Sequence, residues 1–276
     1  MSAAGFAAEA AKLPAFIRRD WKIALSYRAV FVADVLGLAS QVFVFFFIAK
    51  LIDPGALPTY GGTVPSYLAF VVIGLVINLT AGVLLYTVAN SLRQEQMMGT
   101  MEALLSTPTS GATLQFGSVA YTLMLVPIRA AALLTAIGLL FGLDLHVSGA
   151  LPALALLLCF LPFTWGLGLI SAGLVVTFRR GTNATGFVVT ALGLISGAVF
   201  PIAMLPGVLR TIAEWNAFAI AIEGVREALI GGSGWGAALS DMARLVPLSL
   251  AGLALGVLCF RWAMQRERRR GTLGQY

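Results

Sequence analysis

The sequence predicts an all-α polytopic membrane protein with six transmembrane helices, and two observations support this fold class. Of the 276 residues, 59% are hydrophobic and only 11% are charged, whereas a soluble domain contains about 25% charged residues. Several apolar runs also reach the roughly 20 residues that a helix needs to cross a bilayer. These runs lack the alternation of polar and apolar residues that barrel strands show. We therefore expect a single transmembrane domain over residues 1–276.

Basic residues predict how the helices are oriented. The expected spans place 13 Lys and Arg residues on one side of the membrane and 4 on the other. Because Lys and Arg accumulate on the cytoplasmic side, we expect both termini in the cytoplasm. The basic residues that give the net charge of +6 are then placed to interact with anionic lipid headgroups. We therefore expect no nucleic-acid partner. The expected spans are residues 30–52, 67–91, 115–142, 151–177, 184–206 and 243–263.

Residues 13–28 precede the first span and form an amphipathic pattern. Phe16 and Trp21 lie on a broad apolar face, and Arg18 and Lys22 lie on the opposite face. A helix of this kind lies in the headgroup layer, with its Trp as an interfacial anchor. The pattern predicts an interfacial helix, and a simple juxtamembrane anchor explains it equally well.

Residues 92–114 form the longest connection expected on the cytoplasmic side. The loop combines charged residues and Met with a short helical pattern that ends at Thr107 and Pro108. Its apolar residues need a surface to pack on. Either the loop folds back against the membrane, or it docks to a cytoplasmic partner.

The segment 200–230 is too polar to span the membrane and too apolar to be a free loop. Pro201 and Pro206 are expected to break the fifth span near its outer end. Glu223 and Arg226 follow among apolar residues at helical spacing. Irregular backbone at membrane depth is tolerated where protein or a water-filled cavity covers it. We therefore expect short re-entrant helices here, before the last span.

The second span contains a polar stripe. Asn78, Gly82, Tyr86 and Asn90 recur every four residues and so lie along one slowly drifting face. Such a face on a spanning helix meets other helices or water and avoids lipid. The stripe either lines a transport path or joins helices by hydrogen bonds.

Arg129 is the one charge expected deep within a span, beside Pro127. A charge at the bilayer centre costs about 2.5–3.5 kcal/mol on insertion scales. It needs an ion-pair partner, a water-filled cleft or a route to the headgroups, and either a functional or a structural role accounts for it. Pairs of glycines four residues apart, such as Gly252 and Gly256, permit close helix contact. In a chain with 30 glycines, such pairs also arise by chance.

Catalytic motifs are absent from the sequence. It contains no phosphate-binding loop of the form GxxxxGK[ST], and neither HExxH nor GxSxG occurs. The chain has one His and two Cys residues, which do not suggest a metal site. We expect no catalytic site, no metal site and no bound cofactor in this chain.

The most specific motif lies in the loop after the second span. From residue 93 to residue 108 it reads RxxxxxGTxExLLSTP. Together with the amphipathic helix, the span order and the broken outer segment, it resembles the membrane permeases of type 2 ATP-binding-cassette (ABC) exporters, in particular their drug and lipid branch. This order of helix, spans and outer segment extends over nearly the whole chain. The family usually has Asn-Pro where this chain has Asn216-Ala217, so the outer segment departs from the family pattern.

The resemblance implies a role for each segment. Residues 13–28 would be the elbow helix, and 92–114 would be the coupling loop that contacts a separate nucleotide-binding ATPase subunit. That subunit would use ATP and Mg, which this chain does not bind. The implied coupling residues are Arg93, Gln94, Glu95, Gly99, Glu102, Leu105 and Pro108.

The resemblance also implies a pathway between two permease copies, most simply a homodimer. ATP binding would close the ATPase subunits and rock the helix bundles outward by alternating access. The chain would lie in the cytoplasmic (inner) membrane of a prokaryotic cell. The outer re-entrant segment would include Pro201, Pro206, Glu223 and Arg226, and the implied pathway-lining residues are Asn78, Tyr86, Asn90, Thr190 and Ser196.

Several functions stay open at this point. The favoured cargo is hydrophobic or amphipathic, such as a drug or a lipid, and the alternative is a polysaccharide or a lipid-linked glycan. A sugar path would favour aromatic residues, which make up only 10% of the chain. A secondary transporter or channel that does not use ATP is a further alternative. Such carriers usually show intramembrane acids or two broken helices in symmetric positions.

Overall fold

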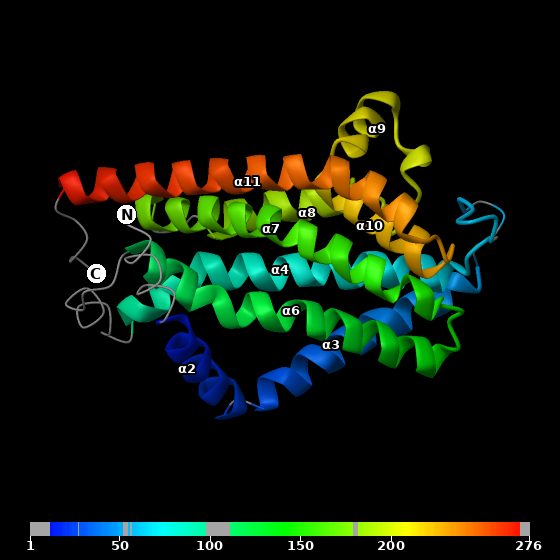
Figure 1. Ribbon diagram of the computed structural model, residues 1–276, viewed down its shortest axis with the longest axis horizontal. Coiled ribbons are helices and arrows are strands. Elements are labelled where there is room, and N and C mark those ends of the chain that lie inside the picture. Colours follow the sequence, from blue (N-terminus) through cyan, green and yellow to red (C-terminus); the bar gives the residue numbers. More distant parts are fainter. Residues whose placement is uncertain are drawn as a thin grey trace.

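The computed structural model describes residues 12–26, 28–51, 55, 57–97, 111–178 and 182–270. These residues form a bundle of long helices that run side by side (Figure 1). The long helices are α3 (Arg28–Ala49), α4 (Tyr67–Met97), α6 (Gly111–Phe141), α7 (Ala150–Phe178) and α11 (Trp235–Arg270). The shorter elements are α2 (Leu13–Ser26), η2 (Val147–Gly149), α8 (Thr182–Leu194), η3 (Ile202–Met204), α9 (Gly207–Glu214) and α10 (Ala217–Leu229). The short helices α9 and α10 lie toward one end of the bundle, and the short helix α2 lies toward the other (Figure 1).

Four helices in the described part of the chain are long and apolar enough to cross a membrane. Their apolar stretches are Tyr67–Asn90, Val119–Phe141, Val147–Val175 and Trp235–Arg266. They confirm an all-α polytopic membrane fold and match the second, third, fourth and sixth expected spans. The apolar stretch found in α3 is the shorter Ala39–Ala49, and α8 has only 13 residues. That α3 and α8 also cross the bilayer stays a prediction.

The bundle is arranged around α4. Its buried side chains belong to a core that also includes residues of α7 and α10. Figure 1 shows the end of α4, the start of α6 and the end of α11 at one end of the bundle. The connections 57–66, 142–149 and 230–234 lie at the other end. Successive connections thus lie at alternate ends of the bundle, as the order of the spans predicts.

Helices α7 and α11 pack closely through glycine. A Cβ atom on Gly166 would lie 2.3 Å from the carbonyl oxygen of Gly252, and one on Gly256 would lie 2.3 Å from the carbonyl oxygen of Gly166. Only glycine leaves room for backbones at this separation. The Gly252/Gly256 pair therefore does form a helix contact.

The expected amphipathic helix is present as α2. It ends at Ser26, and α3 starts at Arg28 in a different direction (Figure 1). Its apolar side packs on α6, where a Cβ atom on Gly117 would lie 2.8 Å from the ring of Phe16. The rings of Trp21 and Tyr121 meet edge to face at 6.2 Å between centroids. Its position in the headgroup layer stays a prediction.

The fifth expected span, 184–206, is shorter than predicted. Helix α8 ends at Leu194, and residues 195–200 are irregular before η3 begins. Gly197 has φ +75°, a left-handed conformation that glycine adopts without strain. Pro201 and Pro206 precede η3 and α9, and short helices do lie between 200 and 230. That they re-enter the membrane stays a prediction. The last helix begins at Trp235, before the predicted start at residue 243.

Candidate functional site

The polar stripe is the least buried face of α4. Tyr86 is 65% exposed, and Asn78, Gly82 and Asn90 are half-buried. The side chains on the opposite face of this half of the helix are buried, as at Leu84 with no exposed area. Residues four apart share one face of a helix. The stripe therefore points away from the bundle of its own chain.

The amides of this stripe form hydrogen bonds within α4. Asn78 Nδ2 donates to the carbonyl oxygen of Gly74 at 3.2 Å, and Asn90 Nδ2 donates to that of Tyr86 at 2.9 Å. Asn78 also lies against α8, since a Cβ atom on Gly193 would sit 2.6 Å from Asn78 Oδ1. These bonds do not tie α4 to another helix. They leave a polar strip on an otherwise apolar surface, and such a strip is costly against lipid.

Helix α8 lies beside this strip and is also poorly covered. Its Thr190 is exposed, and its Phe187 and Leu194 are 77% and 56% exposed. Ser196, the fifth predicted lining residue, is fully buried. Its hydroxyl donates to the carbonyl oxygen of Gly193, so it satisfies a backbone acceptor at the end of α8. The structure brings Asn78, Tyr86, Asn90 and Thr190 to open or half-open positions on neighbouring helices and places Ser196 inside.

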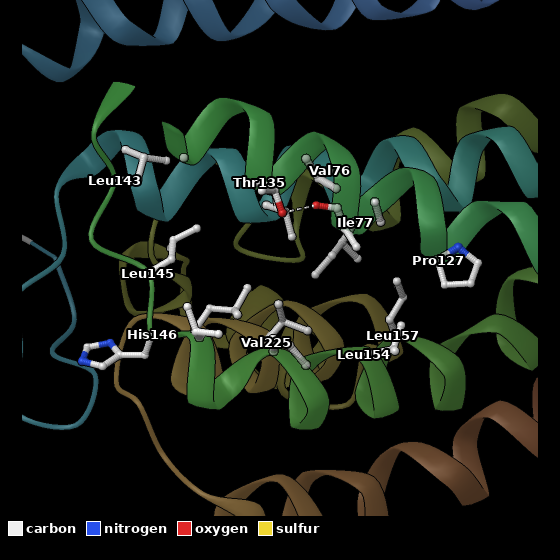
Figure 2. Close-up of a pocket in the computed structure, with 18 of the residues that line it drawn as sticks. Val76, Ile77, Pro127, Thr135, Leu143, Leu145, His146, Leu154, Leu157 and Val225 are labelled. Atoms are coloured by element: carbon white, nitrogen blue, oxygen red, sulfur yellow. Dashed lines mark hydrogen bonds between the residues drawn. The ribbon is translucent and has the colours of Figure 1, made fainter. Parts of the chain in front are cut away.

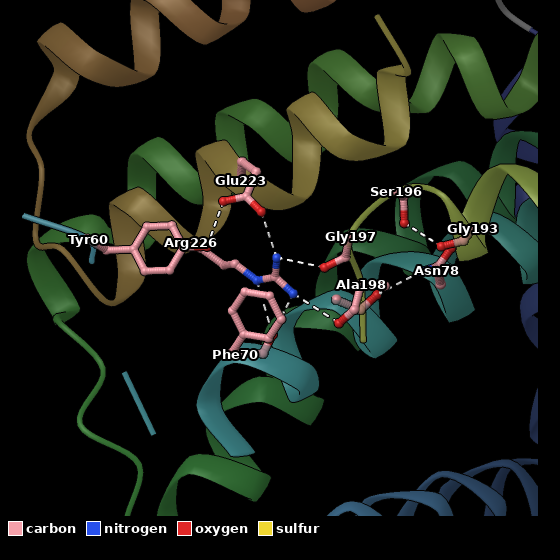
Figure 3. Close-up of polar contacts among 10 residues, drawn as sticks. Tyr60, Phe70, Asn78, Gly193, Ser196, Gly197, Ala198, Glu223 and Arg226 are labelled. Atoms are coloured by element: carbon pink, nitrogen blue, oxygen red, sulfur yellow. Dashed lines mark hydrogen bonds and ion pairs between the residues drawn. The ribbon is translucent and has the colours of Figure 1, made fainter. Parts of the chain in front are cut away.

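A break in the backbone follows α8, at residues 195–200. When a helix ends, its last carbonyl oxygens lose their partners. An unsatisfied polar group in an apolar medium costs several kcal/mol. Here side chains from other elements replace the missing donors, and Figure 3 shows Arg226 with the carbonyl oxygens of Gly197 and Ala198.

Arg226 of α10 is the main donor to this break. Its guanidinium is fully buried and donates to the carbonyl oxygens of Gly197 at 2.9 Å, Ala198 at 2.9 Å and Phe70 at 2.8 and 3.0 Å. The guanidinium carbon also lies 3.4 Å from the centroid of the Phe70 ring. Arg has five N–H donors in a rigid fork, which suits a site with several carbonyl oxygens. Arg226 thus joins α10 to α4 and to the broken segment.

Glu223 balances the charge of Arg226. Its Oε1 accepts from Arg226 Nη1 at 2.8 Å, and its Oε2 accepts from the hydroxyl of Tyr60 at 2.6 Å. Tyr60 lies in the connection before α4, and burial raises its pKa well above the ordinary value of 10.0. The negative charge of Glu223 raises the pKa further, and the positive charge of Arg226 acts against this rise. The hydroxyl therefore stays protonated and keeps its role as donor.

Two more side chains donate hydrogen bonds to backbone carbonyl oxygens at or near the break. The hydroxyl of Tyr67 donates to the carbonyl oxygen of Val199 at 3.1 Å. Asn216 Nδ2 donates to that of Leu192 at 2.9 Å, and Asn216 Oδ1 accepts from the N–H of Phe218 at 3.0 Å, which caps α10.

Sequence reasoning missed the roles of Tyr60, Tyr67 and Asn216. For Asn216, a signal was present, because Asn is a favoured cap just before an apolar helix. For the two tyrosines, the sequence offers no local signal, since their partners are more than 100 residues away.

Arg129 lies in the middle of α6, and its side chain is half-buried. Pro127, two residues before it, is inside the helix. That Arg129 lies at the middle of the bilayer, and with what role, stays a prediction.

The coupling loop lies largely outside the described residues. Gly99, Glu102, Leu105 and Pro108 belong to residues 98–110, which the structure does not describe. Arg93, Gln94 and Glu95 lie in the last turns of α4, which ends at Met97. Their side chains are not described. The predicted roles of these seven residues stay predictions.

Comparison with known proteins identifies the family. The family model for the ABC-2 type transporter membrane domain matches residues 13–230. This match extends from the start of α2 to the end of α10 and so covers the stripe and the break. No curated protein matches the sequence. The chain belongs to the ABC-2 type transporter family and is a multi-pass permease subunit of an ABC transporter.

Proposed function

We propose that this chain is the transmembrane half of an ATP-driven exporter, and that two copies form its pathway along the exposed faces of α4 and α8. The observation that supports the proposal is the polar stripe on an uncovered face. Tyr86 is 65% exposed and lies between half-buried Asn78 and Asn90. In a membrane, such a face needs protein or water beside it.

A second copy satisfies this need most simply. Most homo-oligomers have closed symmetry, and a two-fold axis places the same surface on both sides of the contact. With such an axis near α4 and α8, two polar stripes would face each other. The Tyr86 and Thr190 side chains of both copies would then border one central space.

The surface also favours an amphipathic cargo. Asn78, Asn90 and Thr190 provide amide and hydroxyl groups, and Phe187 and Leu194 provide apolar area beside them. Ligand sites that combine apolar lining with a few polar groups select molecules of the same mixed character. We propose a drug-like or lipid-like cargo.

The energy would come from a separate ATPase subunit at the end of the bundle where α4 ends and α6 begins. Residues 92–114 connect these helices and would contact that subunit. ATP binding would then favour the outward-open conformation, and cargo would be released because the two conformations differ in affinity for it. Transport would run out of the cytoplasm across the cytoplasmic membrane.

The test is purification of the tagged chain from its native membrane in mild detergent. We expect a soluble ATPase with a phosphate-binding loop to co-purify in a one-to-one ratio. The double variant Glu102→Arg/Leu105→Arg should lose it. Glu214→Arg is the matched control, because Glu214 is exposed on α9 at the other end of the bundle. An intact oligomer without any ATPase would overturn the proposal.

A further inference from the structure

An apolar cavity lies on the opposite side of α4 from the polar stripe. It has a volume of about 430 Å³ and lies between α4, α6, α7 and α10 (Figure 2). Its lining includes Val76, Pro127, Leu139, Leu154 and Val225. Val76 and the stripe residues lie on different faces of the helix, because successive residues turn by about 100°. The cavity is therefore separate from the proposed pathway.

The length of the cavity matches one leaflet of a bilayer. Its lining follows α6 from Pro127 to Leu139, a distance of about 18 Å at 1.5 Å per residue. Half of the hydrocarbon core is about 15 Å thick. Leu139 and Val147, at the loop end of the cavity, are 82% and 86% exposed, as residues that face lipid are. The cavity thus has the dimensions and polarity of a site for an acyl chain.

A second pocket adjoins the first at the end of α6, and the two share Leu143. This pocket has a volume of about 330 Å³ and differs in chemistry, since Lys50, Asp144, Thr63 and Ser66 are among its lining residues. It lies where α3 and α6 end and α4 begins. These helix ends mark the level at which the bundle leaves the hydrocarbon.

Lys50 and Asp144 place one positive and one negative charge in this pocket. Lys50 Nζ lies 4.9 Å from the centroid of the Phe46 ring. Within the described part of the chain, no ion pair joins Lys50 to Asp144. A zwitterionic headgroup with a phosphate and a primary ammonium complements both charges at once. Its phosphate would accept from Lys50, and its ammonium would donate to Asp144.

We propose that the two pockets together form a binding site for a zwitterionic phospholipid with a primary amine. The headgroup binds between Lys50 and Asp144, and one acyl chain fills the cavity between α6 and α7. This inference goes beyond the proposed function and does not depend on it, since the site lies within one chain and on the far side of α4 from the stripe.

The experiment is native mass spectrometry of the detergent-purified chain after exchange into defined lipids. The probes are palmitoyl-oleoyl phosphatidylethanolamine, phosphatidylcholine and phosphatidylglycerol at equal concentration. We expect one phosphatidylethanolamine to stay bound at collision energies that strip the other two. Its retention should exceed theirs by about tenfold, the factor that one charge-assisted hydrogen bond provides.

Four variants locate the site. Asp144→Asn should remove the preference for phosphatidylethanolamine, and Lys50→Gln should weaken the retention of all three lipids. Ala131→Phe should fill the cavity, because Ala131 lines it, and should release the tightly held lipid. Ala132→Phe is the matched control, since Ala132 is exposed on the same helix and outside the cavity lining.

Three outcomes would overturn the proposal. The first is equal retention of the three lipids by the unmodified chain. The second is a retained lipid that Ala131→Phe and Ala132→Phe affect alike, which indicates lipid on the outer surface only. The third is a preference for phosphatidylglycerol that Asp144→Asn leaves unchanged, which indicates an anion site. None of these results bears on ATPase binding, so the test does not decide the proposed function.

Discussion

The two halves of α4 differ in composition and in surroundings. From Tyr67 to Ile77 every side chain that can be buried is buried, with exposed fractions of 0–8%. From Asn78 to Asn90 every fourth residue is open or half-open. The first half contacts the broken segment and Arg226, and the second half contains the polar stripe.

This difference separates a structural framework from the surface that we propose borders the pathway. The buried half is held by hydrogen bonds from α10 and by the ring of Phe70 under Arg226. The open half forms hydrogen bonds within its own helix, as at Asn78 and Asn90. We expect substitutions in the first half to change stability, and substitutions in the second half to change transport.

Arg226→Ala should give the largest effect. It removes a buried charge, leaves Glu223 without its ion-pair partner and leaves the carbonyl oxygens of Gly197 and Ala198 unsatisfied. The expected loss of stability is about 3–5 kcal/mol, seen as a lower thermal midpoint in detergent or as failure to accumulate in the membrane.

Arg210→Ala is the control for that loss. Arg210 pairs with Glu214 in an exposed contact at 3.2 Å, which is worth at most about 1 kcal/mol. Equal effects of Arg226→Ala and Arg210→Ala would contradict the framework role of the buried half.

Gly74→Ala should give the next largest effect. A Cβ atom at Gly74 would lie 2.4 Å from the carbonyl oxygen of Ala198, and a contact with backbone cannot be relieved by a side-chain rotation. We expect a loss of about 1–3 kcal/mol. Gly82→Ala in the open half is the matched control, because nothing lies within 4 Å of its Cβ position. Thermal unfolding of the two variants side by side measures the difference, and a Gly82→Ala loss as large as that of Gly74→Ala would contradict it.

Tyr60→Phe should cost about 1 kcal/mol, because it removes the hydrogen bond to Glu223. The variant also tests the raised pKa. An acid whose folded pKa lies above its unfolded value of 10.0 contributes stability below pH 10 and loses it as pH rises further. Between pH 10 and 11, wild-type stability should therefore fall more steeply than that of Tyr60→Phe, by up to about 1.4 kcal/mol per pH unit. Parallel curves would show that Tyr60 is not held protonated.

Tyr86→Ala should change stability least, by about 0.5 kcal/mol or less, as expected for an exposed side chain. Its effect should appear in function, as a loss of cargo-stimulated ATPase activity in the reconstituted complex. A fluorescent short-chain phospholipid and a hydrophobic cationic dye are suitable probes. Leu255→Ala is the control, since Leu255 is 58% exposed on α11 and outside both the stripe and the lipid site. A large drop in stability, or equal loss of activity in both variants, would place Tyr86 outside the pathway.

The sequence predicted the helical class, four of the spans and the amphipathic helix, because each depends on local composition. It also predicted the stripe from its period of four residues. It did not predict whether the stripe faces the other helices of its own chain or the outside of the bundle. That depends on how α7 and α10 pack around the helix, and the sequence of one segment does not contain this information.

The position of the break shows a second limit. Pro201 and Pro206 are visible helix breakers, and they led to an expected end at residue 206. The helix ends at Leu194 because Gly197 adopts φ +75° and because Arg226, 29 residues away, supplies the donors. A break that depends on distant donors leaves no local pattern.

The contact of Phe16 with Gly117 has a mechanical consequence. It ties α2 to the first turns of α6, and the first turn of this helix is part of the proposed coupling segment, residues 92–114. With α2 at the depth of the headgroups, as its composition predicts, α6 cannot slide along the membrane normal without moving α2 through the lipid surface. In the proposed transport cycle, the lipid surface would therefore oppose any movement of α6 along the membrane normal, and bilayer thickness and lateral pressure would set part of the work of one turnover.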